Sequence, residues 1–309
     1  MRFLRFSDGV ASRVGVLAEG GEVVRVVEGA GDLLPLIQAG EGELRAAGEA
    51  ALRGGAAVEA AGVTPLAPVG TPPTVRDFYA FEQHVAAGRA SRGQAVHPDW
   101  YELPVFYFSS PYAVTGCGEV PMTPGTAAFD FELEVAAIVG RGGRDLTPEE
   151  GEAAVLGYCV MNDFSGRDVQ RREMRQGMGP VKGKDTATAL GPWLVTKDEL
   201  AGHREGTGYR LAMTCEVNGV RYSEDLWSRV YWSFGEMIAY ASRGAEVRPG
   251  DVIGSGTCGT GCILELSATH GPERYPWLKP GDEVVAAIEG LGALRNTVTE
   301  GVPPVPLRP

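Results

Sequence analysis

Short runs of alternating apolar and polar residues dominate the chain and predict a protein that is mainly β with some α. Near the N-terminus, GVLAEGGEVVRVV alternates around a Gly-Gly turn, which is typical of a β-hairpin. Residues 33–55 have the apolar spacing of a helix. The stretch TPLAPVGTPPT is rich in Pro and Gly and continues neither element. We therefore predict a small β-rich N-terminal domain over residues 1–68 and a larger domain over residues 69–309.

The larger domain repeats the strand pattern. Its apolar and β-branched runs between turn residues are LEVAAIVG, LGPWLVT, RLAMTCEVNG, DVIGSG and DEVVAAIEG. We expect a few helices among them. Residues 147–156 begin with Thr-Pro-Glu-Glu, which places Pro and acidic side chains in the first helical turn, and residues 233–242 also favour a helix. A β-dominated domain follows.

The composition is that of a folded, acidic protein. Of 309 residues, 44% are hydrophobic and 22% are charged, which excludes a disordered chain. The net charge of -12 argues against nucleic acid and membrane surfaces as partners, because phosphate groups are also negative. If the substrate is itself an acid, Lys or Arg side chains and a bound cation must reverse the sign of the charge inside the pocket.

The cysteines and the lengths of the apolar segments indicate the cellular compartment of the protein. The five cysteines are odd in number and lack paired CxxC spacing, so we expect reduced thiols and no zinc site built from them. The segment MRFLRFSDGV has no long apolar core, and no stretch approaches the length that spans a bilayer. We expect a cytoplasmic protein.

Carboxylates form the sharpest local feature. In FDFELEVAAIVG, Glu132 and Glu134 are two residues apart in a strand-like run, so their side chains point to the same face. Like charges repel, and the spacing leaves open a protonated carboxyl, a bound cation or a solvent-exposed face. Asp163 of MNDFSGRDVQ follows an apolar run, as at the end of a buried strand. This position is typical of a pocket rim, but also of a turn or a helix N-cap.

Further polar residues accompany these acids. Arg167 and Gln170 would share one face of a helix that begins after Asp163. In VRDFYAFEQHV, Asp77 and His84 lie about two helical turns apart with Tyr79 between them. A catalytic histidine would have to be one of four in the chain. His84 is the candidate, although a lone histidine is more often structural or exposed.

Three more segments offer polar groups: VFYFSSPY, GPVKGKDTATALGPW and IGSGTCGTGCILEL. Their candidates are Tyr107, Lys182, Lys184, Thr188, Thr257 and Glu265. In a purely structural interpretation, Lys182 is a solvated charge, Tyr107 belongs to the core and Thr257 lies in a flexible turn. We interpret the apolar ILEL as a strand, where Glu265 either faces solvent or is buried with a partner.

Taken in order, these segments resemble the fumarylacetoacetate hydrolase superfamily from about residue 74 to about residue 290. The resemblance is carried by the E-x-E of FELEVAAIVG, by MNDFSGRDVQ, by GKDTATALGPW and by GSGTCGTG followed by LEL. DFYAFEQHV is similar to a segment of fumarylacetoacetase-type members, and the short N-terminal part looks like that of acylpyruvase-type bacterial members. The resemblance implies a mixed β-sandwich roll with a small N-terminal β-rich domain, and a homodimer.

Carried over by position, the resemblance also implies roles for residues of this chain. The metal ligands would be Asp77, Glu132, Glu134 and Asp163. The catalytic residues would be His84 and Glu265, which activate water, and Lys184. The substrate contacts would be Tyr79, Tyr107, Arg167, Gln170, Thr188 and Thr257. The substrate-binding arginine that follows the histidine in fumarylacetoacetase would be Arg89 or Arg92.

This site implies a hydrolase acting on carbon–carbon bonds in ketonic substances. Four carboxylates suit a hard divalent cation, Mg²⁺ first with Ca²⁺ or Mn²⁺ as alternatives, which stabilises the enolate released from a 1,3-dicarbonyl acid. The substrate would be fumarylacetoacetate or an acylpyruvate-like acid from aromatic-compound or amino-acid catabolism. No organic cofactor is expected, since hydrolysis requires none and the sequence has no P-loop motif. An oxaloacetate-type decarboxylase, a keto-acid isomerase and a non-catalytic ligand- or metal-binding module are the alternatives.

Overall fold

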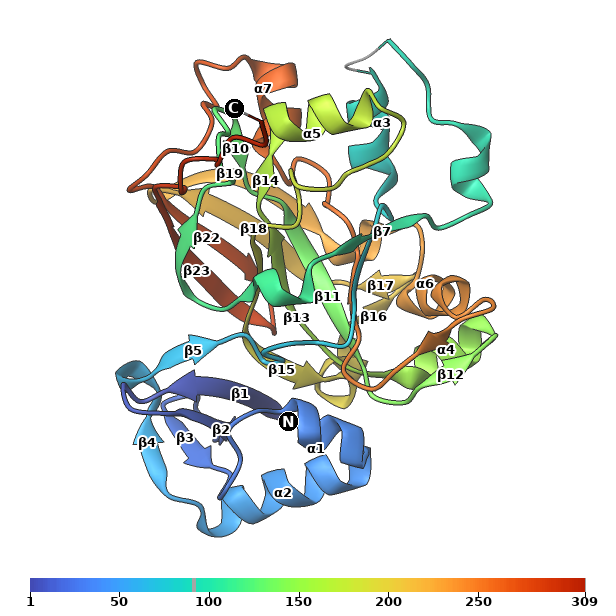
Figure 1. Cartoon of the computed structure of the whole chain (residues 1–309). Helices are drawn as coiled ribbons and strands as arrows, with labels where there is room; N and C mark the ends of the chain where they lie inside the picture. The colour runs from blue at the N-terminus through green and yellow to red at the C-terminus, as the bar shows by residue number, and fades with distance from the viewer. Residues whose placement is uncertain (91–92, 309) are drawn as a thin grey trace.

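Two β-sheets packed on one another form the body of the protein (Figure 1). The computed structural model describes residues 1–90 and 93–308. The larger sheet has the strand order β4-β3-β2-β1-β15-β13-β11-β21-β6-β7, with β5 paired to β1 and β8 paired to β15. The smaller sheet has the order β19-β18-β22-β23-β9. One apolar cluster holds residues of both sheets, which confirms the predicted β-rich sandwich.

The strands of the larger sheet are β1 (Arg2–Ser7), β2 (Ser12–Leu17), β3 (Val23–Val26), β4 (Ala57–Glu59), β5 (Thr64–Leu66), β6 (Val75–Phe78), β7 (Phe106–Ser109), β8 (Val114–Thr115), β11 (Leu133–Val139), β13 (Val155–Asp163), β15 (Thr188–Thr196) and β21 (Val252–Gly254). Those of the smaller sheet are β9 (Gly118–Pro121), β18 (Ala212–Val217), β19 (Val220–Leu226), β22 (Glu283–Ile288) and β23 (Gly292–Thr299). Short pairs are β10 (Phe129–Asp130) with β14 (Ser165–Gly166), β12 (Gly143–Arg144) with β20 (Glu246–Val247), and β16 (Arg204–Glu205) with β17 (Gly208–Tyr209). The helices are α1 (Leu34–Ala39), α2 (Glu41–Gly54), α3 (Glu82–Ala90), α4 (Pro148–Ala154), α5 (Arg167–Met174), α6 (Phe234–Ala241) and α7 (Ile263–His270).

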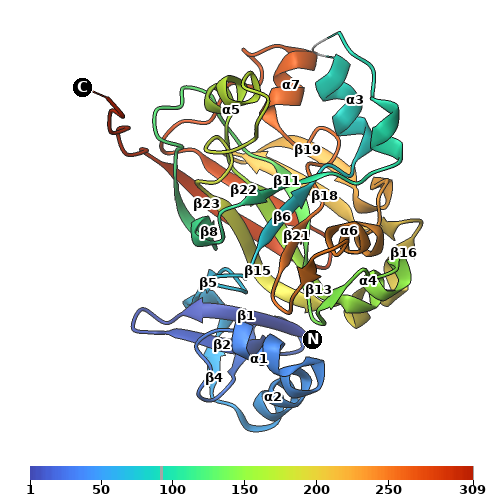
Figure 2. The ribbon, with the colours of Figure 1, turned by 45° about the vertical axis from the view of Figure 1, so that its right-hand side comes forward.

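The N-terminal segment forms the predicted hairpin. β2 and β3 pair antiparallel, and the turn between them contains Gly20 and Gly21 at φ of 89° and 78°, where a side chain would be strained. The predicted helix is present, but it divides at Gly40, whose φ is 112°, into α1 and α2. β1 pairs with β15 of the following segment, so the larger sheet continues across the domain boundary that we predict near residue 69. Figure 2 shows this N-terminal part against the end of β15.

The central strands explain the long apolar runs. Every residue of β11 and β13 is buried, because each strand has neighbours on both sides and is covered on both faces. In their antiparallel register Leu133 lies opposite Asn162. The start of β11 therefore lies beside the end of β13, and the backbone amide of Asp163 donates to the carbonyl of Glu132 over 3.2 Å.

Local signals placed two helices correctly. Thr147 and Ser233 each form a capping box with the glutamate three residues later, and α4 and α6 begin directly after them. The helices α3, α5 and α7 gather at the end of the molecule opposite the N-terminal part (Figures 1 and 2). No helix in the described part of the chain is long and apolar enough to cross a membrane.

Two sequence-based interpretations were wrong. Asp77 and His84 do not lie on one helix, since Asp77 belongs to strand β6 and His84 to helix α3. The apolar ILEL is not a strand: it begins helix α7, with Glu265 buried in its first turn. Both segments are short, and short apolar runs fit either period.

Candidate active site

A cavity of about 830 Å³ opens at the end of the molecule where α3, α5 and α7 gather. The predicted site residues that line it are Asp77, Tyr79, His84, Tyr107, Glu132, Glu134, Arg167, Gln170, Lys184, Thr257 and Glu265. Asp163 and Thr188 are not among the lining residues. Asp163 contacts the lining residues Lys184 and Tyr107, whereas the hydroxyl of Thr188 lies 3.2 Å from that of Ser109. The tertiary structure thus brings distant segments to one cavity.

Three carboxylates meet at the base of the cavity. Asp77, Glu132 and Glu134 are buried, and each offers an oxygen within 4.8 Å of the others. β6 runs parallel to β21, so Asp77 lies opposite Gly254. A Cβ atom at Gly254 would lie 2.5 Å from Asp77 Oδ1, so a glycine is needed for the carboxylate to fit there. The exposed alternative for Glu132 and Glu134 is therefore excluded.

Asp163 adds a fourth carboxylate. Its Oδ2 accepts hydrogen bonds from Lys184 Nζ over 2.7 Å and from the hydroxyl of Tyr107. Its Oδ1 is buried and has no hydrogen-bond partner among the described residues. A buried oxygen without a partner is unfavourable unless something else supplies one. A set of carboxylate oxygens with one left unpartnered fits a hard divalent cation.

Burial and mutual repulsion make this cluster hard to ionise without a cation. Burial raises the pKa of Asp163 to about 7 despite the neighbouring Lys184 ammonium. Burial and the negative charges of Asp77 and Glu132 raise the pKa of Glu134 well above its usual range. Burial opposes the charge of Glu132 as well, but the Lys184 ammonium and the Arg167 guanidinium outweigh it and lower the pKa of Glu132.

Arg167 anchors the cluster to α5 and α7. Its Nε lies 2.7 Å from Asp130 Oδ2, its Nη2 lies 2.7 Å from Glu132 Oε1, and its Nη1 donates to Gln170 Oε1 over 3.1 Å. Asp130 also accepts from the backbone amides of Ile263 and Leu264, which fixes the start of α7. We did not predict Asp130, although it precedes Glu132 by two residues and the alternation D-x-E-x-E was visible.

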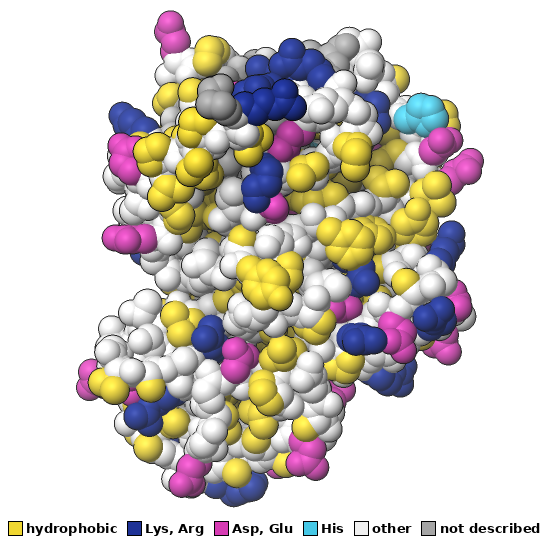
Figure 3. All heavy atoms as spheres, in the orientation of Figure 1, with side chains coloured by type: hydrophobic (Ala, Val, Ile, Leu, Met, Phe, Trp, Pro, Cys, Tyr) yellow, Lys and Arg dark blue, Asp and Glu magenta, His cyan; other side chains and the backbone are white. Residues whose placement is uncertain are grey.

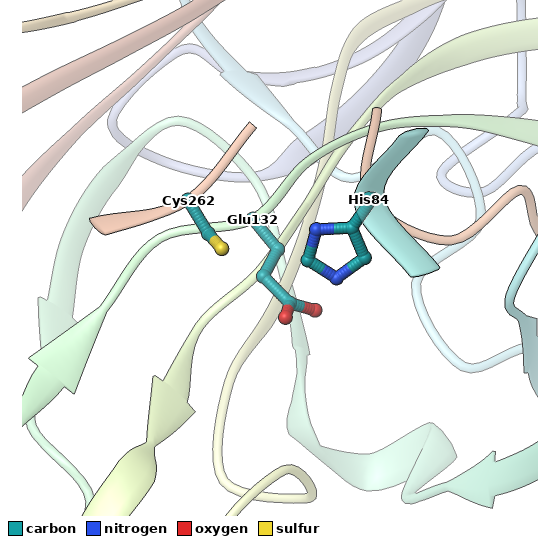
Figure 4. Close-up of side chains that lie close together, drawn as sticks. All are labelled: His84, Glu132 and Cys262. Atoms are coloured by element: carbon teal, nitrogen blue, oxygen red, sulfur yellow. The ribbon is translucent and has the colours of Figure 1, made fainter. Parts of the chain in front are cut away.

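His84 and Glu265 form the predicted pair. His84 Nδ1 lies 2.9 Å from Glu265 Oε2, and the backbone amide of Thr260 donates to Glu265 Oε1 over 2.9 Å. Both side chains are buried. In the tautomer whose Nδ1–H donates to this carboxylate, Nε2 of His84 is an acceptor. Figure 4 shows the Glu132 side chain between the His84 ring and the Cys262 thiol. Cys262 is buried, and we did not predict it as a site residue.

The remaining predicted residues surround the carboxylates. The hydroxyl oxygen of Tyr107 lies 2.6 Å from Asp77 Oδ2, and Thr257 donates to Glu134 Oε1 over 3.4 Å. Tyr79 packs edge-on against the His84 ring at 5.6 Å between centroids. Arg89 lines the cavity, whereas Arg92 lies outside the described residues. The substrate-binding role of each of these residues stays a prediction.

Known proteins share sequence similarity with this chain. The chain is 28% identical over 275 residues to the fumarylacetoacetase of Oryza sativa subsp. japonica, a match that covers 70% of this chain and 64% of that protein. It is 29% identical over 220 residues to an oxaloacetate tautomerase of Bacillus subtilis (strain 168), covering 69% and 68%. The chain thus spans less than two thirds of the length of the plant fumarylacetoacetase.

Solved structures share the fold. A fumarylacetoacetate hydrolase from the psychrophile Exiguobacterium antarcticum superposes with a TM-score of 0.74 at 26% identity, covering 97% of this chain and 99% of that chain. A fumarylpyruvate hydrolase from Pseudomonas aeruginosa in complex with Mn²⁺ and pyruvate gives 0.60 at 26% identity, covering 77% and 91%. The family model for the fumarylacetoacetate (FAA) hydrolase C-terminal domain matches residues 73–299, which is most of the chain. This chain therefore belongs to the fumarylacetoacetate hydrolase family.

Proposed function

We propose that this protein is a metal-dependent hydrolase that cleaves a carbon–carbon bond in a 1,3-dicarbonyl acid of the fumarylacetoacetate or acylpyruvate type. One observation carries the proposal: the His84–Glu265 pair, with 2.9 Å between Nδ1 and Oε2, lines the same cavity as three clustered carboxylates. A base for water and a site for a cation are the two devices that this hydrolysis needs.

Asp77, Glu132, Glu134 and Asp163 would hold the cation. Their oxygens suit Mg²⁺ first, with Ca²⁺ or Mn²⁺ as alternatives, and we propose no organic cofactor. When bound, the cation supplies positive charge close to the oxygen on which enolate charge develops. The related fumarylpyruvate hydrolase of Pseudomonas aeruginosa was solved with Mn²⁺ and pyruvate, which supports a divalent cation and a keto-acid ligand here.

The chain's own residues move the proton. The Glu265 carboxylate accepts the Nδ1–H bond of His84 and stabilises the ring when it becomes positively charged. His84 Nε2 takes a proton from a water molecule, whose oxygen bonds to the substrate carbonyl carbon. The carbon–carbon bond then breaks, and its electron pair enters the leaving keto acid as an enolate. The protonated His84 returns the proton to the enolate carbon, which restores the neutral base.

Lys184 and Arg167 supply the positive charge that an acidic protein needs in order to bind an acid. Lys184 Nζ contacts Glu132 and Asp163, and these carboxylates outweigh its burial and raise its pKa. Its ammonium therefore stays charged and is available to the substrate oxyanion. Each positioned donor of this kind lowers the barrier by about 3 kcal/mol.

A product assay tests the proposal. The protein loaded with Mg²⁺ is incubated with fumarylacetoacetate, acetylpyruvate, fumarylpyruvate and oxaloacetate, with EDTA as the metal-free control. We expect metal-dependent release of two acid fragments. His84→Ala should keep the metal but lower hydrolysis at least about a hundredfold, whereas His203→Ala, a change at an exposed histidine, should not. Full activity of His84→Ala would contradict the mechanism.

An oxaloacetate tautomerase is the second candidate, because the chain is 29% identical to the tautomerase of Bacillus subtilis over 220 residues. A tautomerase would exchange the C3 protons of oxaloacetate with solvent deuterium and release no fragments. Carbon dioxide from oxaloacetate alone would indicate a decarboxylase. If the protein binds metal but converts no substrate of the panel, the remaining hypothesis is a non-catalytic ligand- or metal-binding module.

We also propose a homodimer, as the family resemblance implies. Phe108 and Tyr112, on β7 and the turn after it, are 61% and 88% exposed, and large exposed aromatic side chains favour a protein interface. Figure 3 shows apolar side chains on the face that carries β7. Light scattering should give twice the chain mass, and Phe108→Asp with Tyr112→Asp should shift it to one chain mass. The cytoplasmic location and the role in catabolism stay predictions.

A further inference from the structure

A row of arginines on α5 leads outward from the carboxylates. Arg167, Arg171 and Arg175 are four residues apart, so they share one face of the helix, and all three line the cavity together with Gln170 and Met174. Arg175 caps the helix and keeps helical backbone angles. Because a helix rises about 1.5 Å per residue, successive arginines lie about 6 Å apart along its axis.

The inner arginine and the two outer ones differ in their partners. Arg167 is buried against Asp130 and Glu132. Arg171 and Arg175 are exposed and form no ion pair with any acid of the described residues; the Nε of Arg175 donates to the backbone carbonyl of Arg171 over 3.3 Å. The acids on α5 point elsewhere: Asp168 accepts from the loop before β10, and Glu173 accepts from three backbone amides of the loop after α5. The two outer arginines therefore carry uncompensated positive charge at the cavity wall.

This concentration of positive charge is unexpected in a chain of net charge -12. Figure 3 shows Lys and Arg side chains gathered over the part of the surface that α5 occupies. Arg89 of α3 also lines the cavity, and its Nε is buried with no hydrogen-bond partner among the described residues. The lining of the same cavity also includes apolar side chains, among them Phe106, Met174 and Leu264.

We propose that Arg171 and Arg175 form a subsite for a second carboxylate, and that the substrate is consequently a diacid. This inference rests on the proposed function, in which the keto-acid end of the substrate lies at the carboxylate cluster. A short apolar chain would cross the middle of the cavity, and the far carboxylate would meet the outer arginines. A guanidinium binds a carboxylate through two parallel hydrogen bonds, which makes arginine the side chain suited to this task.

Binding of two matched probes tests the subsite without relying on turnover. 2-Oxoglutarate and 2-oxopentanoate both have five carbons and the same 2-keto-acid end, but only the first has a far carboxylate. Neither contains the 1,3-dicarbonyl unit that the proposed reaction cleaves. Calorimetric titration of the Mg²⁺-loaded full chain should show 2-oxoglutarate binding about tenfold more tightly, the lower end of what a charge-assisted contact contributes, since the arginines are exposed.

Charge-removing variants assign that preference to residues. Arg171→Gln with Arg175→Gln should abolish the tenfold preference and change the affinity for 2-oxopentanoate less than about twofold. Arg172→Gln is the matched control, because it removes one charge from the same helix at an exposed position outside the cavity. Its preference should match that of the unaltered protein.

The outcomes separate this proposal from the proposed function. Equal affinity for both probes, or a preference that survives in the double variant, would overturn the second-carboxylate subsite and leave the hydrolase proposal standing. Failure of both probes to bind the metal-loaded protein would overturn the keto-acid site as well. In turnover assays the double variant should raise the KM of a diacid such as fumarylpyruvate and leave its kcat, and the KM of acetylpyruvate, unchanged.

Discussion

Metal binding at the carboxylate cluster should release protons and strengthen steeply with pH. Asp163 has a pKa of about 7, so it is largely protonated at pH 6, and burial together with the charges of Asp77 and Glu132 raises the pKa of Glu134 well above its usual range. A carboxylate must lose its proton to hold a cation. Each displaced proton gives a tenfold gain in affinity per pH unit, so the Asp163 proton alone gives about tenfold per unit below pH 7, and a proton displaced from Glu134 adds to it. Lys184 stays protonated and Glu132 ionised throughout.

Calorimetric titration with Mg²⁺ or Mn²⁺ in buffers of different ionisation enthalpy counts the released protons. Asp163→Asn should lower that number by one at pH 6, because the asparagine amide has no proton that is released when the metal binds. Asp198→Asn is the control: Asp198 has a lowered pKa and is already ionised, so the count should not change. Metal binding that releases no proton at pH 6 would refute the reasoning.

The same shift sets the sign of the stability change in the metal-free protein. An ordinary aspartate, as in the unfolded chain, has a pKa of 3.8, whereas the pKa of Asp163 in the folded protein is about 7. The folded state therefore binds the proton of Asp163 more tightly than the unfolded state does. The resulting stability is complete below pH 3.8 and is lost as the pH rises to about 7. The Asp163 contribution to the thermal midpoint should thus fall between pH 5 and pH 8, and added Mg²⁺ should stabilise most at pH 8. Asp163→Asn should weaken this pH dependence.

Three substitutions test the fold. Arg167→Ala removes the guanidinium that pairs with the buried carboxylates of Asp130 and Glu132. The free energy of unfolding, measured by urea titration, should fall by about 3–5 kcal/mol. A loss below about 1 kcal/mol would contradict the claim that these ion pairs are buried. Thr147→Ala removes the capping box of α4 and should lower it by about 1 kcal/mol without changing activity; an activity loss with the fold intact would contradict this. Gly157→Ala places a Cβ atom 2.2 Å from a backbone oxygen of β15. The melting temperature should fall by several degrees, which corresponds to a loss of about 1–3 kcal/mol in the free energy of unfolding. An unchanged melting temperature would show that β13 and β15 can move apart without cost.

Signals that act within a few residues were read correctly from the sequence. Gly20 and Gly21 allow the turn of the β2–β3 hairpin, and Thr147 starts α4, because turn and cap preferences depend on neighbouring residues alone. The continuous apolar run before Asp163 predicts a buried strand, and this acid does end β13. The family resemblance connected motifs that lie far apart in the sequence. The family model, which matches residues 73–299, agrees with that resemblance.

Spacing could not settle what depends on distant neighbours. An alternation of two puts Glu132 and Glu134 on one face of a strand, but only side chains that distant segments bring over that face, such as Arg167 and Lys184, bury it. The ILEL run fits strand and helix equally, and its helical start is fixed by two hydrogen bonds to Asp130, which is 133 residues from Ile263 in the chain.

The sequence by itself thus determined the elements and the kinds of side chain available for chemistry. The tertiary structure alone decided which of them meet. His84 and Glu265 are 181 residues apart in the chain and 2.9 Å apart in space. The α5 arginines are ordinary surface charges until the fold turns their face toward the cavity. The physical reason is that pairing between distant strands and helices depends on the free energy of the whole packed core, which no local pattern contains.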